Sequence, residues 1–249
     1  SPSALTTGLD GSIWVASYDW DTVQRIVQDQ NGNWGVQQFG DRPSIDVDVM
    51  PKLLTTGTDG AIWVACTNTI EADWGHYPGS IQRIVEGQDG QWFVQGKAIS
   101  IDSEPLGLTR GLDGTVWVAS FNYGTVQQIV QDQHGNWGVQ RFGDRPSIAV
   151  DNGPSGLSTG ADGSIWVAAK SNGTVQQIVN QRGGWFVQGS AIPIGYRARA
   201  IITGRDGSIW VGSSDGGTRQ LWTNPAKPTD LVGSYDLAAG RVTLTGKAP

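Results

Sequence analysis

One ten-residue piece recurs five times along the chain. "GLDGSIWVAS" begins at Gly8, and close copies follow as "GTDGAIWVAC", "GLDGTVWVAS", "GADGSIWVAA" and "GRDGSIWVGS". The equivalent tryptophans lie 44 to 54 residues apart, at Trp14, Trp63, Trp117, Trp166 and Trp210. A repeat of this period is typical of propeller blades and other arrayed units, because one such unit cannot bury its apolar faces without a neighbour.

Each repeat reads as four short strands, named A to D in chain order. "ALTTG" leads through Asp-Gly into "SIWVAS", and "TVQRIVQDQ" leads through Asn-Gly into "NWGVQQF". These dipeptides favour hairpins, since both central residues of a type I′ turn need positive φ. We therefore expect an all-β chain, a five-bladed β-propeller with four-stranded antiparallel blades of about 50 residues.

The 249 residues are expected to form a single propeller domain, because all-β folds of this length commonly have one core. The blades fall near residues 4–51, 52–105, 106–155, 156–198 and 199–249. After "TRQLW" the segment "LVGSYDLAAGRVTLTG" predicts a further hairpin, one strand more than blade five requires. The sequence leaves open which of these strands completes that blade.

Composition excludes several classes of protein. A net charge of -6 and a pI of about 4.8 argue against a nucleic-acid partner, which needs clustered Lys and Arg. The single cysteine, Cys66, excludes an internal disulfide framework, and no Cys/His group has zinc spacing. No apolar run approaches about 18 residues, so no membrane insertion is expected. The chain is expected to be cytoplasmic, or secreted without disulfides.

Two recurring residue types have structural explanations. The strand-B tryptophans should fill the wedge between blades, since each aromatic side chain buries about 150–250 Å². The Asp of each Asp-Gly turn should cap its own turn through its side chain. "DQNGN" and "DQHGN" resemble calcium loops faintly, but they lack the later bidentate Glu and occupy hairpin turns. We therefore expect neither a metal nor a cofactor.

A glutamine recurs at the third position of strand C, at Gln24, Gln82, Gln127, Gln176 and Gln220. An unpaired buried amide costs about 1–3 kcal/mol, so each of these side chains needs a partner. Two explanations stay open: a structural ladder of amides, or amides that line repeated polar pockets.

Aromatic residues in the B–C connections suggest a ligand surface. Trp20 lies in "SYDWDT" and Trp74 in "TIEADWGHYPG", and "GDRPSI" recurs in the D–A connections on the same face. Exposed aromatics beside carboxylates and amides can stack on a sugar ring and bind its hydroxyls. A surface salt bridge is the alternative explanation for the Asp-Arg pairs. The candidate ligand-binding residues are Asp19, Trp20, Asp41, Arg42, Trp74, Tyr77, Asn122, Tyr123, Asp144 and Arg145.

Groups suited to catalysis are few. His134 replaces Asn31 of the first repeat in a hairpin turn, and His76 lies alone in the blade-two insertion. No nucleophile with a neighbouring base is evident. Paired carboxylates stay possible at Asp19, Asp21, Glu71 and Asp73.

These observations favour a non-enzymatic, multivalent lectin that binds glycans or glycoproteins between blades, since repeated weak sites give avidity. One alternative is a lyase or hydrolase with a single site at the central channel. The other is a protein-interaction propeller.

The repeat also resembles known blades. "TTGxDGxIWVA" followed by "TVQRIV" is similar to the blade of streptogramin-lyase-like and sensor-kinase propellers. The lyases of that group rely on a histidine and a metal in a central site, and their rings usually have more blades. In build, five compact Trp-rich repeats also resemble the five-bladed tachylectin-2-type lectins, which implies sugar binding.

Overall fold

The computed structural model describes the chain except for residues 68–77, 196, 215–216, 222–231, 237–240 and 246–249. It is an all-β, five-bladed β-propeller, as predicted. Blade one contains β1 (Pro2–Thr7), β2 (Ile13–Ser17), β3 (Thr22–Gln28), β4 (Trp34–Val36) and β5 (Ile45–Asp46), with a short 3-10 turn η1 (Tyr18–Trp20). Blade two contains β6 (Pro51–Thr56), β7 (Ile62–Thr67), β8 (Gly79–Glu86) and β9 (Trp92–Ile101).

The remaining blades repeat this order. Blade three contains β10 (Pro105–Arg110), β11 (Val116–Ser120), β12 (Thr125–Gln131), β13 (Trp137–Val139) and β14 (Ile148–Ala149). Blade four contains β15 (Pro154–Thr159), β16 (Ile165–Ala169), β17 (Thr174–Gln181) and β18 (Gly184–Pro193). Blade five contains β19 (Ala198–Thr203), β20 (Ile209–Ser213) and β21 (Thr218–Leu221).

Blade five differs from the four-stranded prediction in its described residues. Its sheet has three strands there, β19-β20-β21. The predicted extra hairpin is present as β22 (Val232–Asp236) and β23 (Arg241–Thr245), and these two strands pair with each other as a separate sheet.

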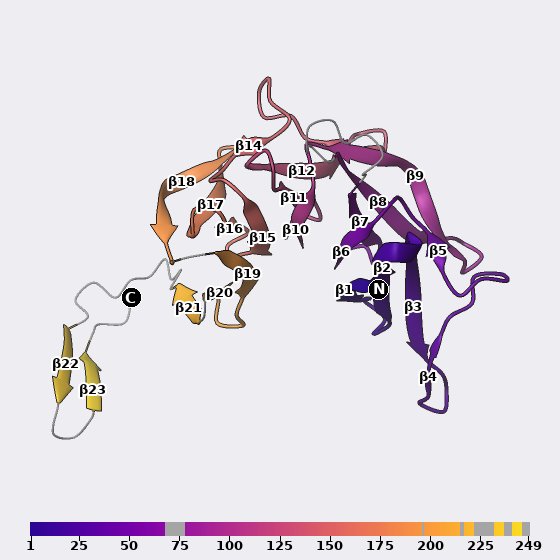
Figure 1. The fold of residues 1–249 in the computed structure, drawn as a ribbon, viewed down its shortest axis with the longest axis horizontal. Helices are drawn as coiled ribbons and strands as arrows, with labels where there is room; N and C mark the ends of the chain where they lie inside the picture. Colours follow the sequence, from indigo (N-terminus) through magenta and orange to yellow (C-terminus); the bar gives the residue numbers. More distant parts are fainter. Residues whose placement is uncertain (68–77, 196, 215–216, 222–231, 237–240, 246–249) are drawn as a thin grey trace.

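The blades follow one another along an arc (Figure 1). The first strand of each blade lies on the inside of this arc, and the arc stays open between blade five and blade one. Because the strands of a blade alternate in direction, the B–C and D–A connections emerge on one face, here called the upper face. The A–B turns and C–D hairpins emerge on the opposite, lower face.

The Asp-Gly turn shows why its residues recur. Asp10 Oδ1 accepts hydrogen bonds from the Ser12 amide (3.0 Å) and hydroxyl (2.6 Å), and Trp14 Nε1 donates to Ser12 Oγ. A Cβ at Gly8 would lie 2.6 Å from Asp10 Oδ1, and Gly11 has φ +83°. Both glycines are therefore required, and the predicted capping role of the aspartate is confirmed.

The "DQNGN" segment is also a capped turn. Asp29 Oδ1 accepts hydrogen bonds from the amides of Asn31 and Asn33, each at 2.8 Å. The backbone and side-chain amides of Asn33 hold the pKa of Asp29 below its ordinary value. His134 occupies the Asn31 position of the equivalent hairpin in blade three and donates its amide to Asp132 in the same way. These residues therefore act as turn formers.

The core consists of layers between consecutive blades. Trp14 and Ala16 of blade one pack against Ile62, Val64 and Ile84 of blade two, and all five side chains are buried. In blades one to four strand B therefore presents its tryptophan to the following blade, and in blades two to five it presents its β-branched residues to the preceding one. This arrangement confirms that the strand-B tryptophans fill the wedges.

The strand-C glutamines connect neighbouring blades. The side-chain oxygens of Gln82, Gln127 and Gln176 accept the backbone N–H of Asp48, Asp102 and Asp151, at 2.5 to 2.8 Å. These three contacts support the structural explanation of the amide ladder. Blade five differs from this pattern. Val211 lies opposite Arg219 and Trp210 opposite Gln220, whereas in blade one Val15 lies opposite Gln24. Gln220 therefore does not hold the position of the other strand-C glutamines.

Candidate functional site

A repeated backbone contact places the B–C connections at the inner edge of the upper face. In each blade a residue at the end of strand B or directly after it donates its N–H to the carbonyl of the residue that precedes strand A. The donors are Tyr18, Thr67, Phe121, Lys170 and Ser214. Because strand A lies on the inside of the arc (Figure 1), these backbone contacts tie the start of each B–C connection to the inner edge of the arc.

A bulge at the start of strand A brings neighbouring blades together at the inner edge of the arc. The register shifts after the first residue of every strand A, as between Pro51 and Leu53 of blade two. Ser3 and Ser155, at the bulge, donate their hydroxyls to the first carbonyls of the next strand A, at Pro51 (2.6 Å) and Ala198 (2.7 Å). The bulge residue therefore reaches the neighbouring blade.

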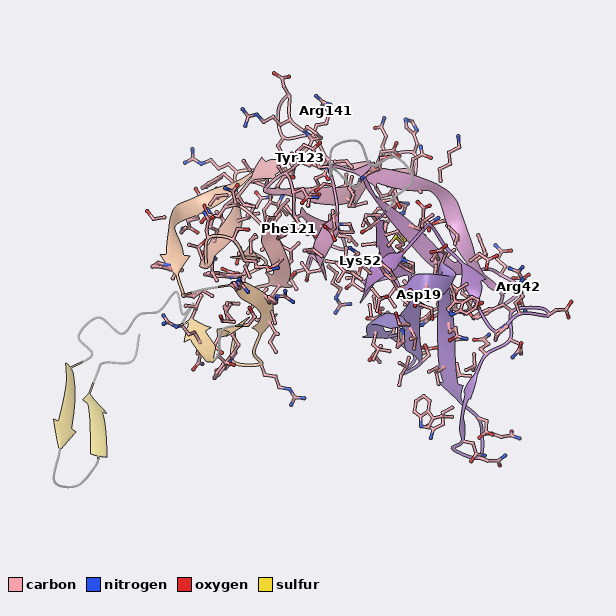
Figure 2. The ribbon with its side chains drawn as sticks, viewed as in Figure 1. Asp19, Arg42, Lys52, Phe121, Tyr123 and Arg141 are labelled. Atoms are coloured by element: carbon pink, nitrogen blue, oxygen red, sulfur yellow. The ribbon has the colours of Figure 1, made fainter. Side chains whose placement is uncertain are left out.

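Lys52 holds this bulge position in blade two and forms an ion pair instead. Its Nζ contacts Glu104 Oε1, directly before strand A of blade three. The two side chains are 20% and 22% exposed, so the pair is largely shielded from solvent. Figure 2 shows Lys52 on the inner side of the arc, and Asp19 over blade one.

We call this group the inner mouth; it comprises Lys52, Glu104, Phe121 and Lys170, which the Lys52–Glu104 pair and the backbone contact from Phe121 to Glu104 link together. Lys170 Nζ lies 5.6 Å from the centre of the Phe121 ring, a distance suited to a cation–π contact. Asp19 pairs with the amino group of Ser1, and hydrogen bonds from this group hold the pKa of Asp19 below its ordinary value. The inner mouth thus combines a carboxylate, two ammonium groups and an aromatic ring from blades two to four.

The predicted ligand-binding residues do not form one cluster. Arg42 pairs with Asp46 in its own exposed connection, and Figure 2 shows it at the outer rim, away from Asp19. Asp41 lies beside Arg42 and is exposed. In blade three Arg145 pairs through its backbone with Phe142, and the Asp144 carbonyl accepts a hydrogen bond from Arg141 at 2.6 Å. Both "GDRPSI" connections are therefore peripheral.

The B–C candidates that the structure describes lie at the surface. Trp20 is 77% exposed and lines a hollow of about 430 Å³ with Ser17 and Gln24. Asn122 donates its amide to Ser103 Oγ at 3.3 Å, and Tyr123 beside it is 53% exposed. Trp74 and Tyr77 lie outside the described residues, and so do Glu71, Asp73 and His76.

Sequence reasoning missed Lys52, Glu104, Phe121 and Lys170. Lys52 follows Pro51 and Glu104 precedes Pro105, and these prolines hold the same position in their blades. The residues beside them differ from blade to blade. Comparison of the positions at which the repeats differ, instead of those at which they agree, would have found this pair.

Two equivalent hollows lie between blades on the lower face. One of about 710 Å³ separates blades one and two and is lined by Asp10, Asp59, Arg83 and Trp92. Its counterpart of about 390 Å³ lies between blades three and four, beside Asp113, Asp162 and Trp185. Both are formed by A–B turns and C–D hairpins, whereas the sequence had suggested sites made by the connections of the upper face.

A metal centre finds no support in the described part of the chain. The described residues contain no group of three His, Cys, Asp or Glu side chains that could hold an ion. His134, the one histidine among them, lies in an exposed hairpin on the lower face. The histidine and metal implied by the resemblance to lyases therefore do not fit these residues.

Cys66 is unsuited to nucleophilic chemistry. Its side chain is fully buried in the layer between blades one and two. Burial raises the pKa of the thiol far above its ordinary value, and the charges of Asp48 and Asp21 act in the same direction. We expect Ellman's reagent to leave the native protein unmodified and to label one thiol in denaturant; rapid labelling of the native protein would contradict this burial.

No described helix is long and apolar enough to span a membrane. No family model matches the chain, and no curated protein sequence matches it.

Solved structures do share the fold. Inactive virginiamycin B lyase from Staphylococcus aureus, solved with quinupristin, is 16% identical (TM-score 0.59), with 98% of this chain and 84% of that one covered. A gluconolactonase from Xanthomonas campestris is 16% identical (TM-score 0.53; coverage 85% and 69%). A functionally unknown protein from Desulfotomaculum acetoxidans is 13% identical (TM-score 0.69; coverage 98% and 68%).

These comparisons confirm the resemblance to streptogramin-lyase propellers at the level of the fold. They contradict two predictions, that the chain is a carbohydrate-binding lectin and that it is not an enzyme. The similar structures that are named for an activity are a lyase and lactonases, and these agree with the alternative of an enzyme. The lectin prediction was wrong because it relied on repetition, which the blade scaffold explains by itself.

Proposed function

We propose that the chain is an enzyme of the lyase or hydrolase kind with a single site at the inner mouth. The observation that carries the proposal is the shielded pair of Lys52 and Glu104, which joins two blades on the inner side of the arc. The similarity to a lyase and to a gluconolactonase supports it. A lactone, a small cyclic ester, is the substrate class we propose.

The inner mouth offers what the hydrolysis of a lactone requires. The Glu104 carboxylate accepts a proton from a water molecule as the water oxygen adds to the carbonyl carbon. The resulting oxyanion lies beside the Lys52 ammonium, which stabilises the developing charge. The ester C–O bond then breaks, the ring oxygen takes the proton from Glu104, and a hydroxy acid leaves.

Phe121 and Lys170 would bind the substrate in this scheme. The ring of Phe121 supplies an apolar wall, and Lys170 supplies a second cation for an anionic group of the substrate or for the product carboxylate. A lyase reaction at the same site would use Glu104 as a base toward a carbon-bound proton of the substrate.

The experiment is an assay of the purified chain with gluconolactone, 6-phosphogluconolactone and virginiamycin B. Acid release is followed in weak buffer, with the spontaneous rate subtracted, and products are identified by mass spectrometry. Hydrolysis adds one water to the substrate, whereas a lyase product keeps the substrate mass. Turnover above background supports the proposal; no turnover and no saturable binding of any of the three would contradict it.

A further inference from the structure

Interior blades meet through paired tryptophans. The strand-B tryptophan of one blade packs on the strand-D tryptophan of the next, with ring centres 4.7 to 4.8 Å apart. The pairs are Trp14 with Trp92, Trp63 with Trp137, and Trp117 with Trp185. In the first two pairs an arginine from strand C lies over both rings. The joints between blades one and two, two and three, and three and four therefore each use one tryptophan from each side.

Polar contacts close the same joints. Besides the glutamine described above, the first hydroxyl of strand C donates to the aspartate of the preceding blade's connection. Ser80 donates to Asp48 at 2.6 Å, and Thr125 donates to Asp102 at 2.7 Å. Hence in blades two to four the side that faces the preceding blade carries a tryptophan, aliphatic side chains, a glutamine and a hydroxyl.

Blade one carries all of these groups on a side that nothing covers in the described structure. We define its rear face as Leu5, Thr22, Gln24, Trp34 and Val36. Leu5 is 67% exposed and Trp34 is 53% exposed. The equivalent residues of blade two, Leu54 and Trp92, pack against blade one. The rear face is thus built as an interface.

Blade five carries the complementary side at the other end of the arc. We define its front face as Ile202 and Trp210. Trp210 is 39% exposed, whereas Trp14 and Trp117 at the same strand position are completely buried. Ile202 stands opposite Trp210, where blade one has Thr6, and it is 59% exposed. The open arc holds these two faces apart (Figure 1).

We propose that the chain associates head to tail with a second copy of itself. The front face of blade five in one copy packs on the rear face of blade one in the next, with Trp210 against Trp34. The contact continues the interface that joins the interior blades, since each face presents the half of the joint that the other face lacks. Such a contact is heterologous, so each copy uses two different surfaces.

Sedimentation velocity over a range of protein concentrations tests this proposal. We expect the unmodified chain to form species larger than the monomer as concentration rises. Trp34→Asp and Trp210→Asp should each weaken association by about thirtyfold or more, because buried tryptophans dominate interfaces. An equimolar mixture of the two variants should form a dimer and nothing larger, because only one intact pair of faces is available.

Two further variants keep the result interpretable. Leu5→Glu alters an exposed rear-face residue and should weaken association as Trp34→Asp does, whereas Phe93→Ser removes an exposed aromatic of blade two and should have no effect. Circular dichroism verifies that each variant is folded. A chain that stays monomeric at every concentration, or variants that fail to complement one another, would overturn the proposal.

Discussion

Replacing Glu104 by Gln lowers lactone turnover by about 10²–10⁴-fold, the contribution typical of a general base. The amide keeps the size of the side chain but cannot accept the proton of the attacking water. The measurement is kcat and KM for the lactone that the assay identifies. We expect the loss in kcat, because proton transfer belongs to the chemical step and not to substrate binding.

Glu86→Gln is the matched control for this variant. Glu86 is exposed at the end of β8, on the lower face, and it should keep the activity of the unmodified chain. Lys52→Ala should also lower kcat, and Lys52→Arg should restore part of it, since the cation is retained. Full activity of Glu104→Gln would show that the inner mouth is not the site, even if the chain is a lactonase.

The second large effect concerns stability. Trp117→Ala is expected to destabilise the protein by about 3–5 kcal/mol, the range for removal of a large core aromatic. Trp117 is fully buried, meets Trp185 at 4.7 Å and stacks on Phe142 at 6.4 Å. Its loss leaves a cavity between blades three and four that the rigid strands cannot fill. Urea unfolding followed by far-UV circular dichroism measures the change.

Trp34→Ala is the comparison for that measurement. It removes the same side chain from a strand-D position that is half exposed, so the free energy of unfolding should fall by less than about 1 kcal/mol at dilute concentration. An equal loss from the two variants would contradict the view that blade stacking buries the tryptophans. It would also show that Trp34 is covered within a single chain.

The local structure of each blade was predictable from particular residues. Asp10 and Gly11 form the expected turn, Asp29 caps the expected hairpin, and Trp14 enters the expected wedge. These features depend on a few consecutive residues, whose turn chemistry and strand periodicity are local properties. For the same reason the hairpin of β22 and β23 was predictable from the sequence, whereas which strand completes blade five was not.

The candidate site was not predictable in the same way. Arg42 was expected beside the ligand because its connection and that of Asp19 emerge on one face, but Figure 2 shows Arg42 at the outer rim, away from Asp19. Distance from the axis depends on where in the blade a connection begins, and the sequence pattern does not record it. Lys52 and Glu104 are 52 residues apart and meet only because two blades stack.

The sequence by itself determined the all-β class, the five blades and the role of the repeated tryptophans, since a repeating unit with two apolar faces can bury them only against its neighbours. Only the tertiary structure decided which connections lie at the inner edge of the arc, where the hollows between blades lie, and which blade faces stay uncovered in the described part of the chain. Those features follow from the stacking of whole blades and the curvature of the arc, which no single repeat encodes.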